Sequence, residues 1–327
     1  MSTPDTPDRA ARQPGTPRPA VPLTSDFVFK YVFGADQGTE GLRGLLSAIQ
    51  EDAGCPALAS VQVTNPFNLK ESEDDKLSVV DVRATDIRGT TFTVEAQATY
   101  HAAFPSRALY YWARAYGKQL QESEFYSRLQ PVVGVNLLDF LLFPRSAGAP
   151  MHTSFRPACR EAPHLDPLGD LMIHFIELPR FDPPDRLPST AFGRWMYYIR
   201  YRSKEDAMED PIMKAILEDT SEIREAEKRY QAFLADEELQ DRLEARDKFR
   251  RTHLQLLHDA EQKGKAEGKE EGLQQGREEG REQGIEQGRE EERAKRFESA
   301  RRMKAAGLPP EDIARFTDLP EEEIREL

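Results

Sequence analysis

Two short segments that alternate apolar and polar residues constrain the fold of this chain more than any other feature. They cover Ser78–Asp86 and Thr90–Gln97, and the three-residue loop between them contains Gly89, at a position suited to a left-handed backbone. The loop length fixes the pairing register, which sets Asp81 directly opposite Glu95. The sequence therefore predicts a β-hairpin with one apolar face and one face that carries two opposed acids.

The opposed acids predict a bound cation. Directly opposed side chains have Cβ atoms about 4.5–5.5 Å apart, and like charges at that distance destabilise a strand pair. A divalent cation compensates, because Mg²⁺ is held by one or two carboxylates together with water and phosphate oxygens. We therefore predict that Asp81, Glu95 and the main-chain carbonyl of Ala96 bind Mg²⁺ or Mn²⁺. A solvated acidic face is the alternative interpretation.

This arrangement suits metal-assisted hydrolysis of a phosphodiester. A bound cation lowers the pKa of a coordinated water and neutralises charge that develops on the phosphate. Gln97 follows Glu95 by two residues, and its neutral amide can orient the water or the scissile phosphate by hydrogen bonding. Zinc hydrolysis is disfavoured, because His253 and His258 are five residues apart and do not share a helical face.

The segments around the hairpin predict a mixed sheet flanked by helices, which is an α/β class. The apolar run Pro131–Phe143 is typical of a buried parallel strand. The other predicted strands are Val61–Asn68 and Leu171–Leu178. The predicted helices are a short one ending at Gly34, then Glu40–Gln50, Ser106–Gln121, Thr190–Arg202, Pro211–Asp219 and Glu222–Asp259.

The C-terminal part has a different pattern. Seven glycines, from Gly264 to Gly288, recur every four residues among Lys, Arg, Glu and Gln. They form a winding stripe that another helix can approach closely, which predicts a self-association helix; a frayed charged spacer is the alternative. Ala300–Leu327 predicts a small helical unit, and its acidic last segment favours a protein contact over DNA. We expect a homo-oligomer, a dimer, through this region.

Composition narrows the remaining possibilities. The net charge of -13 requires any DNA contact to be local. No apolar run reaches the roughly 18 residues of a membrane span, the N-terminus lacks the apolar stretch of a secretory signal, and two isolated cysteines fit a reducing cytoplasm. The predicted divisions are a disordered lead-in at 1–22, a core at 23–145, its extension at 146–259, the glycine-periodic segment at 260–298 and the terminal unit at 299–327.

Several segments resemble one nuclease family. Asp75–Asp86 and Phe92–Gln97 are similar to the central motif of the PD-(D/E)xK nuclease family transposases, also called recombination-promoting nucleases. Asp26–Gly34 resembles the opening motif of that family, and Arg107–Tyr126 resembles its helix with a tyrosine-rich face. The glycine-periodic tail also resembles the C-terminal architecture of the family.

The resemblance implies a restriction-endonuclease-like core and a divalent-metal-dependent DNA endonuclease that acts in recombination, mobile elements or defence. Asp81 and Glu95 occupy the two acidic positions of the motif, and Gln97 occupies the position where the wider superfamily has lysine. The glutamine therefore either suffices or borrows charge from Lys30 or Lys76, both of which also fit a role as ordinary surface charges.

Basic residues near the predicted site point to DNA as the partner. Arg107, Arg114 and Lys118 form one stripe on a helix, bordered by Tyr111, and such a stripe can follow a phosphate backbone or simply face solvent. The resemblance adds two residues that would support the metal site through water, Gln119 and Tyr126. The missing lysine leaves an alternative function open: a catalytically weak or inactive nuclease-fold protein that acts as an interaction or regulatory module.

Overall fold

One mixed sheet organises the N-terminal unit of the protein. The computed structural model describes residues 21–35, 39–64, 82–166 and 168–327. Within these residues the sheet has six strands in the order β1-β2-β3-β4-β6-β5. The central strands β3, β4 and β6 are parallel, and the remaining neighbours are antiparallel. The strands are β1 Val61–Val63, β2 Val82–Asp86, β3 Thr91–Gln97, β4 Val132–Leu138, β5 His152–Phe155 and β6 Leu171–Glu177.

The β2–β3 hairpin has the predicted register. Val82 pairs with Val94 and Ala84 with Phe92. The connecting loop carries Gly89 at φ +90°, the left-handed conformation expected there. The start of the first hairpin strand, predicted over Ser78–Asp86, lies outside the described residues, and so do Asp81 and Lys76. The opposition of Asp81 to Glu95 would continue the observed register and stays a prediction.

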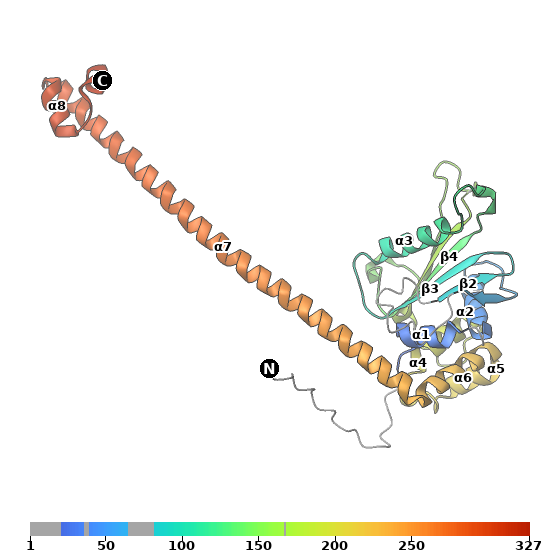
Figure 1. Cartoon of the computed structure of the whole chain (residues 1–327). Coiled ribbons are helices and arrows are strands. Elements are labelled where there is room, and N and C mark those ends of the chain that lie inside the picture. The colour runs from blue at the N-terminus through green and yellow to red at the C-terminus, as the bar shows by residue number, and fades with distance from the viewer. Residues whose placement is uncertain (1–20, 36–38, 65–81, 167) are drawn as a thin grey trace, which may run out of the picture. The chain divides into compact units, whose positions relative to one another are not determined.

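Helices cover both faces of the sheet (Figure 1). The helix α3 lies on one face, and α1, α2, α4 and α6 lie on the other. The larger core fills the second face, where the apolar side of the hairpin meets these helices. The α/β class predicted from the sequence is thus confirmed. The helices of this unit are α1 Asp26–Phe33, α2 Thr39–Asp52, α3 Phe104–Gly117, α4 Ala191–Tyr201, α5 Pro211–Asp219 and α6 Ser221–Ala235, with short 3-10 turns at Tyr126–Arg128, Arg145–Ala147 and Leu178–Arg180.

Two elements differ from the sequence-based expectation. The edge strand β5 was not predicted, because His152–Phe155 is short and has little apolar character. The helix predicted over Glu222–Asp259 is divided at Asp236, whose backbone is extended and whose carboxylate accepts a hydrogen bond from the Leu239 amide at 3.1 Å. This is an N-terminal cap that begins the next helix.

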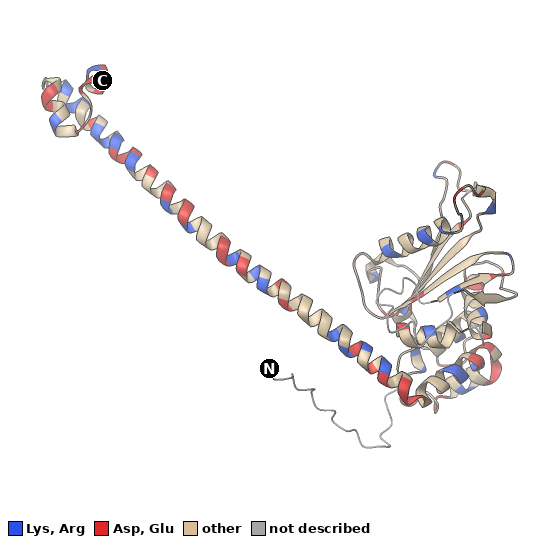
Figure 2. Ribbon diagram, viewed as in Figure 1, with Lys and Arg blue, Asp and Glu red and all other residues tan. Residues whose placement is uncertain are grey.

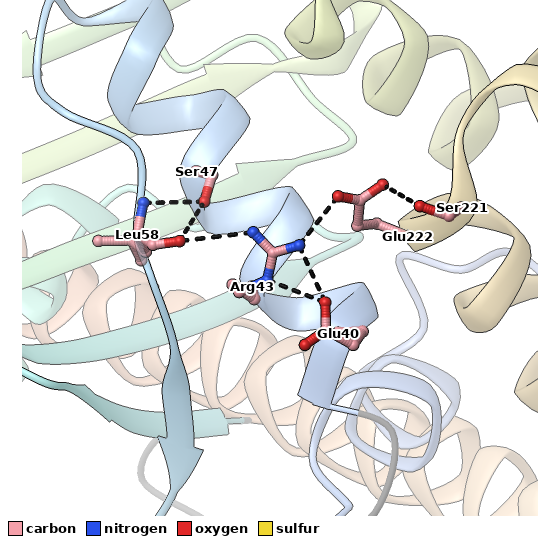
Figure 3. Close-up of polar contacts among 6 residues, drawn as sticks. All are labelled: Glu40, Arg43, Ser47, Leu58, Ser221 and Glu222. Atoms are coloured by element: carbon pink, nitrogen blue, oxygen red, sulfur yellow. Dashed lines mark hydrogen bonds and ion pairs between the residues drawn. The ribbon is translucent and has the colours of Figure 1, made fainter.

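An arginine on α2 fastens the start of α6 to the core (Figure 3). The Arg43 guanidinium donates to Glu40 on its own helix and to Glu222 on α6, each at 2.9 Å. Ser47, one turn further along α2, accepts from the Leu58 amide at 3.0 Å. Side chains of α2 thereby join the main chain of Leu58 and the start of α6, and this cluster is one of the structural contacts of the unit.

The second unit spans 244–327 and has its own small core. The helix α7, Glu237–Ala305, starts within the first unit and continues through the glycine-periodic segment. It is followed by α8 Pro310–Thr317 and α9 Glu321–Glu326, which pack on its C-terminal end around Ala300, Ile313 and Ile324. Figure 2 shows Lys or Arg and Asp or Glu following one another along α7. Among the described helices, none has the length and apolar character needed to cross a membrane.

Candidate active site

The candidate active site lies on the α3 face of strand β3. Strand alternation buries Val94 and Ala96 against the larger core, so Glu95 and Gln97 project from the opposite face, toward α3. The Glu95 side chain is 13% exposed. The predicted hairpin thus places two of its three candidate catalytic side chains together on one face, and the third, Asp81, is outside the described residues.

A guanidinium from α3 reaches both of these side chains. Arg107 Nη2 donates to Glu95 Oε1 in a very short contact and to Gln97 Oε1 at 2.8 Å. The amide nitrogen of Gln97 donates to the Thr99 carbonyl at 3.1 Å, which fixes the orientation of the amide. Within the described residues, Arg107 is the one cationic side chain that hydrogen-bonds to Gln97. The sequence had assigned Arg107 to a phosphate-tracking stripe and did not predict this contact.

The environment of Glu95 opposes its ionisation. Burial raises the pKa of Glu95, although the charge and the hydrogen bond of Arg107 lower it. The net direction is upward, so the neighbouring cation does not fully offset the loss of solvation. A second positive charge beside Glu95 would stabilise its ionised form further, and a bound metal ion can provide that charge.

The packing of α3 decides where Arg107 points. Phe104 and Ala108 are buried against β4 and β6, and the Trp112 indole donates to the Val132 carbonyl at 2.7 Å. These contacts fix the rotation of the helix about its own axis. Arg107 lies one turn after Phe104 and directly before Ala108, with its guanidinium 4.8 Å from the centre of the Phe104 ring and 6.0 Å from that of Tyr111.

The other residues predicted for the site lie elsewhere on α3, in the segment that follows it, or on the opposite face of the sheet. Arg114 is exposed on α3, Lys118 is exposed directly after the end of this helix, and Tyr126 is 83% exposed in the 3-10 turn that follows. The Gln119 side chain is bonded to the main chain of Gln130 through both its oxygen and its nitrogen. Lys30 lies on α1, on the opposite face of the sheet from Glu95.

Sequence reasoning missed a polar residue beside the site. Asn136 on β4 is the Cα partner of Glu95 on β3 and is buried. Its amide donates to the His174 carbonyl on β6 at 3.0 Å. The signal was present in the sequence, because Asn136 is the only polar residue between Pro131 and Leu138. Its position next to Glu95 makes it a candidate for orienting that carboxylate or the group it binds.

The donor atoms at the site suit a hard divalent cation. A carboxylate and a main-chain carbonyl are the oxygen ligands that Mg²⁺ and Mn²⁺ prefer. Glu95 supplies such a carboxylate, with a pKa raised by burial. In the described part of the chain no group of three or more His, Cys, Asp or Glu is arranged to hold a metal. A complete ligand set therefore needs Asp81 or substrate oxygens.

Comparison with known proteins gives one result. Residues 23–260 match the model of a family described as PD-(D/E)XK nuclease family transposase. The match covers most of the chain and includes the hairpin, α3 and the whole sheet. No curated protein and no solved structure matches at a significant level.

Proposed function

Because the chain belongs to the PD-(D/E)XK nuclease family transposases, we propose that it is a divalent-metal-dependent DNA endonuclease of the transposase or recombination-promoting type. The observation that carries this proposal is the cluster of Glu95, Gln97 and Arg107 on one face of the hairpin whose register was predicted from the loop. A buried carboxylate that faces a cation, beside an amide with a fixed orientation, is suited to phosphodiester chemistry.

Each side chain has a proposed role. Asp81 and Glu95, with the Ala96 carbonyl, would hold Mg²⁺ or Mn²⁺, and the bound ion would lower the pKa of a water and neutralise charge on the phosphate. Gln97 would orient the water or the scissile phosphate. Its orientation is supported by the hydrogen bond from its amide to Thr99. Gln119 and Tyr126 keep a supporting role only as proposals.

DNA is the proposed substrate. Arg114 on α3 and Lys118 at the C-terminal end of this helix are exposed and follow Arg107 along the chain. Exposed cations in line with the site can position a phosphate backbone without reading its sequence. The two cysteines of the chain are both free, which supports the proposed reducing cytoplasm.

A catalytically weak nuclease-fold protein is the second candidate. It is favoured by the glutamine at position 97 and by the arginine that already neutralises Glu95. An inactive protein of this kind would keep the fold and the DNA-binding stripe, and it would lack metal-dependent cleavage.

Cleavage of supercoiled plasmid with and without Mg²⁺ or Mn²⁺ separates the two candidates. We expect the wild type to cleave only with metal and Asp81→Asn to lose cleavage while remaining folded. Asp182→Asn provides the matched control, because Asp182 is an exposed aspartate outside the site. Metal-dependent nicking by folded Asp81→Asn at the wild-type rate would contradict the proposed role of Asp81.

Metal binding has a second readout in thermal unfolding. A ligand that binds only the folded state stabilises it by RT ln(1 + [L]/Kd), about 2.7 kcal/mol at a hundredfold excess over Kd. We expect millimolar Mn²⁺ to raise the Tm of the wild type. An equal shift in Glu95→Gln would place the bound ion elsewhere.

We further propose that α7 mediates self-association. An added Cβ at any glycine from Gly264 to Gly288 meets no heavy atom of the described chain within 4 Å, so this stripe is open to a second helix. Residues that follow the glycines are mostly Lys or Arg, and residues that precede them are mostly Glu or Gln. A parallel pair with facing glycine stripes would bring the basic flank of one helix to the flank of the other that carries Glu and Gln, whereas an antiparallel pair would oppose the two basic flanks.

Light scattering tests this association. A chain that ends at Asp259 is expected to have the mass of a monomer, whereas the full chain is a dimer. For orientation, Gly264→Cys in a background with Cys55→Ser and Cys159→Ser should form a disulfide-linked dimer, because only a parallel pair brings the two copies of residue 264 together. An unchanged mass after truncation would contradict the role of α7.

A further inference from the structure

Arg107 has unused hydrogen-bonding capacity at the centre of the site. A guanidinium has five N–H donors, and the hydrogen bonds from Arg107 to Glu95 and Gln97 both come from Nη2. Its Nε is buried and has no hydrogen-bond partner among the described residues. Buried polar atoms are normally paired, so an unpaired Nε in a protein core is costly. A bound anion can supply the acceptor that the described residues do not give this Nε.

The position of Arg107 also allows it to contact substrate. Its side chain is 31% exposed, whereas the Glu95 side chain is 13% exposed. The guanidinium packs against the Phe104 ring, which supports its plane without using a hydrogen-bond donor. Arg114 follows two turns later and is exposed. A phosphate backbone held by the exposed residues of α3 would therefore come within reach of Arg107.

A phosphate oxygen is an acceptor that suits the guanidinium of Arg107. Arginine binds phosphate and carboxylate with the same fork of donors, so it can exchange one for the other. Among the described residues, Arg107 binds a carboxylate through Nη2 alone, so its other nitrogens can bind a second anion. A fully paired arginine would have no such capacity.

We propose that Arg107 supplies the positive charge that Gln97 lacks, and that it moves from Glu95 to a phosphate oxygen when DNA binds, which frees Glu95 for the divalent cation. This inference rests on the proposed nuclease function. In the absence of DNA, Arg107 competes with the metal for Glu95. In its presence, the same arginine neutralises the phosphate at the site.

The exchange makes metal and DNA binding cooperative. If DNA removes Arg107 from Glu95, then DNA raises the affinity for metal, and by linkage metal raises the affinity for DNA by the same factor. A protein of this design binds the metal more weakly without DNA than when a phosphate backbone occupies the site. Cleavage chemistry is thus assembled only on the substrate.

Calorimetric titration with Mn²⁺ in the absence of DNA tests the competition directly. Arg107→Met removes the charge and keeps an unbranched apolar stem. We expect this variant to bind Mn²⁺ about tenfold more tightly than the wild type. The reason is that one nearby opposite charge shifts the pKa of a carboxyl group by about one unit or more, and a competing metal ion should feel an effect of similar size. Arg114→Met is the matched control: it makes the same charge change on the same helix without contacting Glu95, and should leave this affinity unchanged. Glu95→Gln should abolish this Mn²⁺ binding both in the wild type and in Arg107→Met.

Fluorescence anisotropy with a hydrolysis-resistant phosphorothioate duplex tests the proposed contact between Arg107 and a DNA phosphate. Arg107→Met should bind this duplex more weakly in chelator, with a salt slope reduced by about one. In the wild type, Mn²⁺ should raise DNA affinity, and in Arg107→Met this enhancement should shrink. Arg107→Gln serves as a second neutral variant that keeps hydrogen-bonding groups, with folding checked by circular dichroism.

The outcomes separate this inference from the proposed function. Equal Mn²⁺ affinity in the wild type and folded Arg107→Met, or weaker binding in the variant, would overturn the inference and leave the metal site standing. Absence of Mn²⁺ binding in every protein, with and without DNA, would overturn the proposed function. Loss of folding in both Arg107 variants would assign Arg107 a structural role and overturn the inference.

Discussion

Two of the arginine–glutamate pairs in the N-terminal unit share their chemistry and differ in how fully they are hydrogen-bonded. In the α4–α6 pair, Arg202 donates three hydrogen bonds of 2.8–2.9 Å to the two oxygens of Glu227, and both side chains are at most 10% exposed. Tyr198 and Gln231 donate to the same carboxylate. In the α3–β3 pair, Arg107 reaches Glu95 through a single nitrogen.

The difference separates a structural contact from a site. Every oxygen of Glu227 is used, so nothing in that pair can be exchanged without leaving a buried charge. Arg107 has a buried Nε without a partner among the described residues, and burial raises the pKa of Glu95, so both groups are able to bind a further partner. Proteins retain such unsatisfied groups mainly where function requires them.

The largest effect on stability should follow from breaking the α4–α6 pair. Glu227→Gln leaves the guanidinium of Arg202 buried without its countercharge, and we expect the free energy of unfolding to fall by about 3–5 kcal/mol. Urea denaturation of the wild type and the variant measures this. Replacing both Glu227 and Arg202 by leucine should cost less than the single change. A loss below about 1 kcal/mol in Glu227→Gln would remove the contrast between the two pairs.

A buried histidine tests whether an unpaired atom always marks a functional site. His174 lies on β6 with its Nε2 unpaired among the described atoms, and its Nδ1 is 2.9 Å from His152 Nε2. His152 Nδ1 in turn pairs with Asp52 at 2.6 Å. Burial, with the charges of His152 and Arg156, lowers the pKa of His174 to about 3. Burying a neutral imidazole with one unpaired nitrogen costs far less free energy than burying an unpaired charge, so we expect His174 to have a structural role.

The pH dependence of stability checks this assignment. Because the folded pKa is depressed below the ordinary value of 6.5, the unfolded chain binds more protons at mildly acidic pH, and stability is lost as pH falls below 6.5. The expected loss between pH 7 and pH 5 is about 2 kcal/mol in the free energy of unfolding. His174→Gln should reduce this loss of stability at acidic pH, whereas His164→Gln, at an exposed loop position, should not. An unchanged loss in His174→Gln would contradict the lowered pKa.

The next effect concerns the rate of cleavage. Gln97→Lys would place an ammonium beside both the proposed cation and the Arg107 guanidinium, which already bonds to Gln97. We expect cleavage at a fixed metal concentration to slow about tenfold, corresponding to about 1.4 kcal/mol of lost transition-state stabilisation. Single-turnover rates at increasing Mn²⁺ measure it. Faster cleavage at saturating metal would show that the missing lysine limits the enzyme and that Arg107 does not replace it.

The smallest effect on stability should come from the candidate site itself. Glu95→Gln removes a carboxylate whose pKa is raised by burial, and such a group stabilises the fold only below its unfolded pKa and loses that contribution as pH rises through the folded pKa. At neutral pH we expect the free energy of unfolding to rise or to change by less than about 1 kcal/mol, while metal-dependent cleavage is lost. A large destabilisation would make the Arg107–Glu95 pair structural, like its α4–α6 counterpart.

Local patterns predicted much of the fold. The pairing of Val82 with Val94 followed from loop length and strand alternation, both of which are short-range properties. The buried strand β4 followed from its apolar run, and all of its residues are buried. The edge strand β5 could not be predicted in this way, because its pairing with β6 comes from main-chain bonds that leave little trace in side-chain pattern.

By itself, the sequence determined which residues share the face of the hairpin that carries Glu95 and Gln97, because a period of two and a three-residue loop leave no other register. Only the tertiary structure decided that Arg107 meets them. Its contact depends on the rotation and placement of α3, which are set by Phe104 and Ala108 packing on strands far away in the chain. Helical periodicity gives the direction of a side chain relative to its own helix, and packing against distant segments turns that direction into a contact.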